Sequence, residues 1–389
     1  MPVEEFVENI HVVFDQTFKA VIVNVFDITA ETGFSNNVKF CEAIREKLKK
    51  LKILHYFVSD DNVTIASSLI IGNINAKLQE SIFIVMAHET HYIIHDLCFT
   101  DAGYKLISHR YVQVDAKKES LENIKQKIYG SSTPENTVVI SLDPNDPLFL
   151  CLKNNASKFK NLVAFDVSDI YLSVVLYVDE MYKWLMDKRY IKYHVLPASA
   201  RTYFMVTKAV EDANRCRYVD RNEILPFKKY FILDRNCKNA YFTNLAAGTK
   251  IPKLLQEFSL TSKCHYYWFS VSIDAEHFPT VKMEPIIQPQ IQRLPKLLDI
   301  SNNPKVPVIT FFYNISFICV PKNIGSKCYE FLDEWNGIYG KDLYISFDKE
   351  KPKFFEDAFE VYKTNPSFVV YDLLRIISMS PDNIDPNSD

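Results

Sequence analysis

Three histidines, His88, His91 and His95, stand close together in the segment VMAHETHYIIHDLCF. On a helix they would share one face, and on a hairpin that turns at Glu89 and Thr90 the first two would lie opposite each other. Either geometry could gather imidazoles around a zinc ion, since histidine nitrogen is a common zinc ligand. The HExxH arrangement of metalloproteases is absent, because no histidine stands four residues after the first. The apolar flanks favour a strand with structural histidines, and a metal-dependent enzyme is the alternative.

Other catalytic signatures are missing from the sequence. There is no GxSxG nucleophile elbow, and the eight cysteines contain no CxxC pair of the kind that zinc ribbons and thioredoxin-type sites use. Carboxylate pairs such as Asp143 and Asp146 stand in turn-like contexts, where they bond to their own backbone. The sequence therefore predicts no catalytic residue, no cofactor and no metal ion.

Glycine is scarce in this chain. Only eight of 389 residues are glycine, whereas average usage of about 7% would give roughly 27. None lies in a GxGxxG or GxxxxGK[ST] run, the patterns whose backbone approaches phosphates closely. This composition argues against the common nucleotide chemistries.

Four segments share a design of apolar strand, short polar break and second apolar strand. They are residues 11–26, 162–177, 230–245 and 308–321. The first three carry an aspartate at the end of the leading strand, at positions 15, 166 and 234. Because Asp, Asn, Gln and Ser are ordinary turn formers, the pattern predicts four hairpins.

Two of these segments resemble the paired phosphate loops of the actin and heat-shock-chaperone ATPase superfamily. That family places a strand, an aspartate, a glycine-containing turn and a second strand once in each half of its fold. The resemblance implies nucleotide-binding positions at Asp15, Thr17, Asp166, Ser168 and Asp169, with the first and third residue facing a common cleft. Thr17 and Ser168 stand where the family has glycine, and a side chain there obstructs close approach to a phosphate. The resemblance therefore implies a degenerate nucleotide site, with an ATP-binding or ATP-hydrolysing actin-like protein as the alternative.

Helical patterns interleave with the strands. Asn36 or Asn37 can cap a helix that carries an apolar stripe through residue 51. A second helix is predicted from Ser326 to near Gly337, and a third over Ser367–Met379. Alternating strands and helices predict an α/β (or α+β) fold of mixed sheets, built from several hairpins and arranged, on the resemblance, as two actin-like lobes.

Composition shifts divide the chain into five predicted regions. Five prolines fall between residues 284 and 308, which marks an extended connection. The regions are an N-terminal α/β lobe (1–160), a second lobe (161–283), the proline-rich connection (284–307), a C-terminal α/β segment (308–379) and a disordered tail (380–389).

Charge and hydropathy limit the kinds of molecule that this protein is expected to bind. A formal net charge of −3 gives no electrostatic footprint for nucleic acid. The longest apolar stretches are less than half of a membrane span, and MPVEEFVENI lacks the build of a signal peptide. The 28 Phe and 22 Tyr suit interfaces. These features predict a regulatory pseudoenzyme in the cytoplasm or nucleus that binds other proteins and neither membrane nor nucleic acid; partner identity and oligomeric state stay open.

Overall fold

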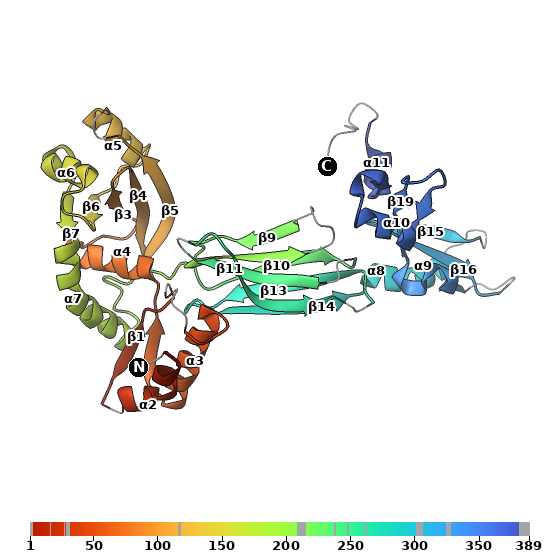
Figure 1. Ribbon diagram of the computed structural model, residues 1–389, viewed down its shortest axis with the longest axis horizontal. Coiled ribbons are helices and arrows are strands. Elements are labelled where there is room, and N and C mark those ends of the chain that lie inside the picture. Colours follow the sequence, from red (N-terminus) through yellow and green to blue (C-terminus); the bar gives the residue numbers. More distant parts are fainter. Residues whose placement is uncertain are drawn as a thin grey trace.

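The computed structural model shows three folded units in a row, joined end to end (Figure 1). We call them the N-terminal unit (residues 3–200), the sandwich (201–286) and the C-terminal unit (287–380). The structure describes residues 3–380 except 16, 27, 29–31, 116–117, 208–214, 237–238, 247–248, 261–262, 301–305 and 324–327. Mixed and antiparallel sheets alternate with helices, so the predicted α/β (or α+β) class is confirmed.

The N-terminal unit is built on a five-stranded mixed sheet and a two-stranded parallel sheet. Its strands are β1 (Ala20–Val23), β2 (Leu54–Phe57), β3 (Ser81–His88), β4 (His91–Thr100), β5 (Gly103–Gln113), β6 (Asn136–Ser141) and β7 (Leu162–Asp166). Its helices are α1 (Val3–Glu8), α2 (Ile10–Val13), α3 (Asn37–Lys50), α4 (Asp60–Ile71), α5 (Leu121–Tyr129), α6 (Pro147–Asn154), the 3₁₀ turn η1 (Ala156–Lys158) and α7 (Val167–Met186).

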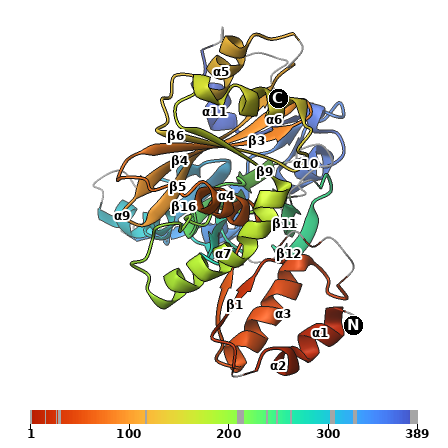
Figure 2. The same cartoon turned by 90° about the vertical axis from the view of Figure 1, so that its left-hand side faces the viewer.

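The larger sheet has the strand order β5-β4-β3-β6-β7, in which β3, β4 and β5 are antiparallel neighbours and β3, β6 and β7 are parallel. Helices α4 and α7 cover one face and α5 and α6 the other (Figure 2). Strands buried on both faces read as continuous apolar runs, which explains sequences such as IFIV in β3.

Helix α3 begins as the sequence predicts. The Asn36 side chain accepts a hydrogen bond from the backbone N–H of Lys39, which satisfies one of the first N–H groups of the helix. The apolar stripe that includes Ile44 and Leu48 is buried against β1 and β2. The predicted cap and stripe are therefore confirmed.

Gly103 opens β5 at a point where the backbone lies against His194. Its φ is +125°, and an added Cβ would lie 2.4 Å from the His194 carbonyl oxygen. We expect Gly103→Ala to lower the free energy of unfolding by more than about 2 kcal/mol, as measured by urea denaturation. Gly130→Ala is the matched control, because its φ is also positive but the nearest atom to the new Cβ is 3.9 Å away. Equal losses in the two variants would contradict the role assigned to the close backbone approach.

The sandwich packs two antiparallel sheets face to face around an aromatic core. One sheet has the order β12-β11-β8-β9 and the other β10-β13-β14. The inner faces contribute buried side chains such as Tyr203, Tyr267 and Phe269. The strands are β8 (Arg201–Thr207), β9 (Arg215–Val219), β10 (Phe227–Asp234), β11 (Asn239–Ala246), β12 (Lys253–Ser259), β13 (Tyr266–Ile273) and β14 (Pro279–Ile286).

The C-terminal unit consists of short helices and two small sheets. Its helices are α8 (Pro289–Gln292), α9 (Leu294–Ile300), α10 (Phe355–Tyr362) and α11 (Leu373–Ser378), with 3₁₀ turns η2 (Asp333–Trp335), η3 (Gly337–Tyr339) and η4 (Pro366–Phe368). Its strands are β15 (Val308–Phe312), β16 (Ile315–Pro321), β17 (Tyr329–Phe331), β18 (Lys341–Asp342), β19 (Ile345–Ser346), β20 (Lys353–Phe354) and β21 (Val369–Val370).

Of the four predicted hairpins, only 308–321 is confirmed, as the antiparallel pair β15–β16. Residues 11–26 contain α2 and β1, and residues 162–177 contain β7 followed by α7. In 230–245, β10 and β11 lie in opposite sheets of the sandwich. Three of the hairpin predictions are therefore wrong, because the pattern of apolar run and polar break does not determine which strands pair.

Two of the predicted helices also differ. The sequence predicts one helix from Ser326 to near Gly337. Ser326 lies outside the described residues, and the residues from Tyr329 onward form β17 and the 3₁₀ turns η2 and η3. The helix predicted over Ser367–Met379 is divided into η4, β21 and the shorter α11.

The unit boundaries differ from those predicted. Strand β7 joins the same sheet as β3 and β6, so the boundary predicted at residue 160 is corrected to about 200. Helices α8 and α9 occupy much of the proline-rich segment predicted as an extended connection. The predicted disordered tail falls almost entirely on residues 381–389, outside the described residues.

Each unit contains one of the three tryptophans. In the N-terminal unit, Trp184 stacks on His194 with 3.9 Å between ring centroids, and the Lys188 ammonium lies 3.1 Å from the centroid of the same indole. Trp268 is 40% exposed on β13 of the sandwich. In the C-terminal unit, the Trp335 indole N–H donates to Ser316 Oγ at 2.9 Å. The three indoles therefore have different surroundings.

Candidate functional site

The first predicted phosphate loop is a local turn. The Asp15 carboxylate accepts hydrogen bonds from the backbone N–H and the hydroxyl of Thr17. Both hydrogen bonds lower the pKa of Asp15 below its usual value, and the bond from the Thr17 hydroxyl has the larger effect. The carboxylate is thereby engaged with its own backbone in the way typical of an aspartate turn.

The second predicted loop is the start of helix α7. Asp166 caps the helix and accepts from the Ser168 N–H at 3.0 Å, while the Asp169 carboxylate accepts from the Asp166 N–H at 3.2 Å. This reciprocal capping box stabilises the first turn of the helix. The carboxylates of Asp166 and Asp169 thus have a structural use within the chain.

The structure does not join the two predicted loops. Asp166 caps the N-terminal end of α7, a helix of 20 residues and so about 30 Å long. Ala20, which opens the strand after Asp15, packs against the cluster that contains Leu185, at the other end of the same helix. Among the described residues, no hydrogen bond or ion pair connects Asp15 or Thr17 with the capping group of α7.

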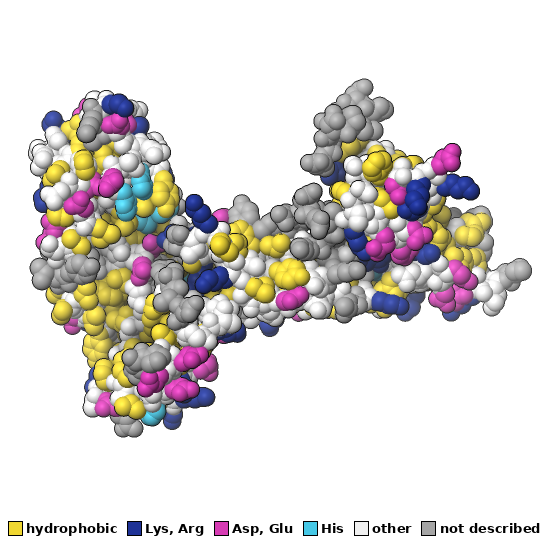
Figure 3. Space-filling view, in the orientation of Figure 1, with side chains coloured by type: hydrophobic (Ala, Val, Ile, Leu, Met, Phe, Trp, Pro, Cys, Tyr) yellow, Lys and Arg dark blue, Asp and Glu magenta, His cyan; other side chains and the backbone are white. Residues whose placement is uncertain are grey.

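The histidines form two pairs. His88 and His91 face each other across the β3–β4 hairpin, with their rings stacked 4.9 Å apart, as the hairpin geometry predicts. His95 lies instead beside His109 of β5, with 3.4 Å between the two Nδ1 atoms. Figure 3 shows histidine side chains gathered near β4 and β5. Within the described part of the chain, no group of three His, Cys, Asp or Glu side chains has the geometry to hold a metal ion.

A cavity lies at the junction of the sandwich and the C-terminal unit, and we call it the junction pocket. Its volume is about 440 Å³, within the range of small-ligand sites. The sandwich contributes Thr207, Arg235, His265 and Tyr266. The C-terminal unit contributes Phe312, Tyr313, Asn314, Asp342, Tyr344, Tyr371 and Asp372.

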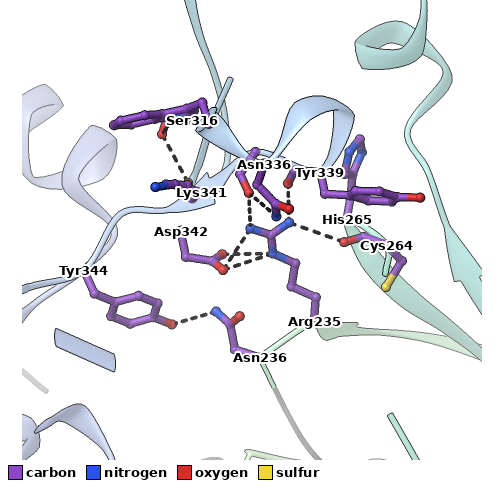
Figure 4. Close-up of polar contacts among 12 residues, drawn as sticks. Arg235, Asn236, Cys264, His265, Ser316, Asn336, Tyr339, Lys341, Asp342 and Tyr344 are labelled. Carbon is purple, nitrogen blue, oxygen red and sulfur yellow. Dashed lines mark hydrogen bonds and ion pairs between the residues drawn. The ribbon is translucent and has the colours of Figure 1, made fainter. Parts of the chain in front are cut away.

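Arg235 holds the two walls of the pocket together (Figure 4). Its Nη2 donates to Asp342 Oδ2 at 2.9 Å and to the Gly340 carbonyl at 3.2 Å, and its Nη1 donates to the carbonyls of Tyr339 and Cys264. Burial raises the pKa of Asp342, and the guanidinium beside it opposes that rise. The ion pair is thus a neutral, hydrogen-bonded unit that fixes the geometry of the junction.

His265 has no free nitrogen in this pocket. Its Nε2 lies 2.7 Å from the Ile338 carbonyl, and its Nδ1 accepts from the Gln288 N–H at 2.9 Å. These bonds make Nε2 the protonated nitrogen of a neutral ring. Burial lowers the pKa of His265, which favours the same neutral state. The imidazole therefore positions the chain and lacks the open nitrogen that a general base needs.

Among the residues that the structure describes, two polar atoms of the pocket lining are buried without a hydrogen-bond partner. Thr207 is 1% exposed, and its hydroxyl makes no hydrogen bond. Asn314 accepts from the Asp372 N–H at 2.8 Å through its carbonyl oxygen, but its buried Nδ2 donates to nothing. An unmade buried hydrogen bond costs about 1–3 kcal/mol, so such atoms in a cavity point to a ligand that would complete them.

Aromatic rings in two contacting groups contribute to the pocket lining. Phe312 contacts both Tyr313 and Tyr266, at centroid distances of 4.7 and 6.4 Å, and Tyr344 contacts Tyr371 at 6.0 Å. Such a lining provides apolar contact and leaves orientation to the few polar groups. The unpartnered polar groups stand among these rings, and the arrangement suits binding.

Sequence reasoning found only one part of this site. The run Tyr266–Ile273 forms the core strand β13, but nothing in its sequence indicates a pocket. Arg235 and Asp342 are 107 residues apart, and no local spacing connects them. The sequence does contain the aromatic segments that line the pocket, but a single sequence does not show that these separate segments lie next to one another in the fold.

No protein-family model matches this chain, and no curated protein matches its sequence.

Proposed function

We propose that this protein is a non-catalytic, regulatory binding protein that holds a segment of another protein in the junction pocket. One observation carries the proposal: an aromatic cavity between two units contains a buried hydroxyl and a buried amide N–H that lack partners. A peptide backbone supplies both carbonyl and N–H groups and could complete these bonds.

The proposal includes a degenerate N-terminal unit of the actin and heat-shock-chaperone type. The described carboxylates that the resemblance assigns to a nucleotide are engaged with their own backbone. These residues do not fit a nucleotide and its magnesium ion.

We place this function in the cytoplasm or nucleus. The described cysteines at positions 41, 98, 151, 264, 319 and 328 are all free thiols, as is usual for proteins of reducing compartments. Within the part of the chain that the structure describes, no helix combines the length and apolar character needed to cross a membrane.

Thr207→Val tests the assignment of the pocket. Replacing an unpartnered buried hydroxyl with a methyl group should raise the free energy of unfolding by up to about 1 kcal/mol while it weakens peptide binding. The measurements are urea denaturation and binding of the full chain to an immobilised library of random nonapeptides. Thr243→Val is the matched control, because its hydroxyl is also buried and unpartnered but lies outside the pocket.

The outcomes separate function from stability. Gain of stability in both variants, with loss of peptide binding only in Thr207→Val, supports the proposal. Absence of any peptide that binds the unchanged protein, or equal binding by the two variants, would refute it. Mg-ATP is the comparison ligand, and saturable stabilisation by it would show that the N-terminal unit retains a nucleotide site.

A further inference from the structure

We infer that the junction pocket recognises a cation, the ammonium or guanidinium group of a lysine or arginine side chain in the bound segment. This inference rests on the proposed function and names the chemistry of its ligand. Three features of the described pocket lead to it: the balance of charge, the aromatic lining and the position of the unpartnered donors.

The charge balance leaves one carboxylate uncompensated. Arg235 and Asp342 neutralise each other, and every nitrogen of the guanidinium has an acceptor. His265 is held neutral by its two ring-nitrogen bonds. Among the described residues, the Asp372 carboxylate, half-buried in the same lining, has no hydrogen bond or ion pair, and the neighbouring Arg375 is exposed. Among the charged groups of the described lining, Asp372 therefore gives the pocket its net negative charge.

The aromatic lining favours the same sign of charge. Ring faces carry negative electrostatic potential, and a cation near several rings is attracted to them most strongly where water is excluded. The rings of Tyr266, Phe312 and Tyr313 form one contacting group of the lining, and those of Tyr344 and Tyr371 form a second. An anion would meet both the ring faces and Asp372 unfavourably.

The unpartnered donors indicate what accompanies the cation. Asn314 is fixed by its bond to the Asp372 N–H, so its free Nδ2 is held near that residue. It needs an acceptor, as a peptide carbonyl beside a basic side chain provides. A free alkylammonium ion offers the charge without the carbonyl, which makes a basic residue within a peptide the better fit.

Three labelled heptapeptides that differ only at the centre, with lysine, norleucine or glutamate, test the inference by fluorescence anisotropy with the full chain. We expect the lysine peptide to bind about tenfold more tightly than the norleucine peptide, and the glutamate peptide to bind more weakly still. Asp372→Asn should remove most of the lysine preference. Asn suits this position, because Asp372 has a φ of 57° and asparagine tolerates left-handed backbone as aspartate does.

Asp333→Asn is the matched control, an exposed aspartate of the same unit outside the pocket. It should leave all three affinities unchanged. Three results would overturn the inference: equal affinity for the lysine and norleucine peptides, tighter binding of the glutamate peptide, or a lysine preference that persists in Asp372→Asn. Each of these results would leave the proposal that the pocket binds a peptide intact. Butylammonium is the remaining probe. If butylammonium displaces the lysine peptide at equal concentration, the pocket binds a free alkylammonium ion as well as it binds a peptide, and the inference that the cation belongs to a peptide is overturned.

Discussion

Replacing Arg235 with methionine is expected to lower the free energy of unfolding by about 3–5 kcal/mol and to separate the C-terminal unit from the sandwich. The change removes the donors to Asp342, Gly340, Tyr339 and Cys264 together. It also leaves the buried Asp342 carboxylate without its cation. Urea denaturation gives the loss of stability, and small-angle scattering gives the change in overall dimensions.

Two further variants identify the cause of that loss. Arg189→Met is the matched control, because Arg189 pairs with Asp187 but its side chain is 92% exposed, and exposed pairs contribute at most about 1 kcal/mol. The double change Arg235→Met with Asp342→Leu should recover much of the loss, since no unpaired charge remains buried. A loss in Arg235→Met no larger than that in Arg189→Met would show that the ion pair does not hold the junction.

The Arg235→Met loss should also depend on pH. Burial already raises the pKa of Asp342, and removing Arg235 removes the main opposing influence. An acid whose pKa is higher in the folded state gains stability as pH falls, because the folded state takes up the proton. The difference between variant and unchanged protein should therefore be smaller near about pH 5 than near about pH 7.5.

Mild acid is expected to destabilise the unchanged protein strongly. Burial lowers the pKa of His95 and of His194 to about 4, and that of His277 to about 3. The unfolded chain takes up these protons near pH 6.5, so stability is retained above that value and lost as pH falls toward the folded pKa. The loss at about pH 5 is on the order of 2 kcal/mol for each histidine.

Urea midpoints measured between about pH 7.5 and about pH 5 test this expectation. His194→Phe should keep the stack on Trp184. It should also reduce the acid-induced loss of free energy of unfolding by the contribution of one histidine. His11→Phe is the control, since the His11 side chain is exposed on α2. A pH dependence that is identical in all three proteins would contradict the assignment of the loss to buried imidazoles.

Local signals explain what could be predicted from this sequence. Asn36 and the stripe after it predict α3, because a cap and a period of 3.6 residues are properties of one segment. The β3–β4 hairpin at Glu89 and Thr90 is local in the same sense. The Asp166–Asp169 capping box is also local, but the β-branched residues that follow it favoured a strand, and tertiary packing overrode that preference.

The remaining features depend on which distant segments meet. Strands β10 and β11 are adjacent in sequence yet belong to opposite sheets, which a hydrophobic pattern cannot express. The junction pocket is more remote still, since Arg235, Asn314 and Asp372 come from three separate parts of the chain. Their roles follow from burial and from missing partners, and both are properties of the folded molecule.

The distribution of one tryptophan to each unit makes the native chain its own reporter of the order in which its units unfold. Trp184 is stacked between an imidazole and an ammonium group, Trp268 is 40% exposed, and Trp335 is anchored through its N–H. Each indole has a different polarity around it and should emit at its own wavelength. Three variants that each retain a single tryptophan would therefore assign every step of a denaturation curve to a unit without any added label.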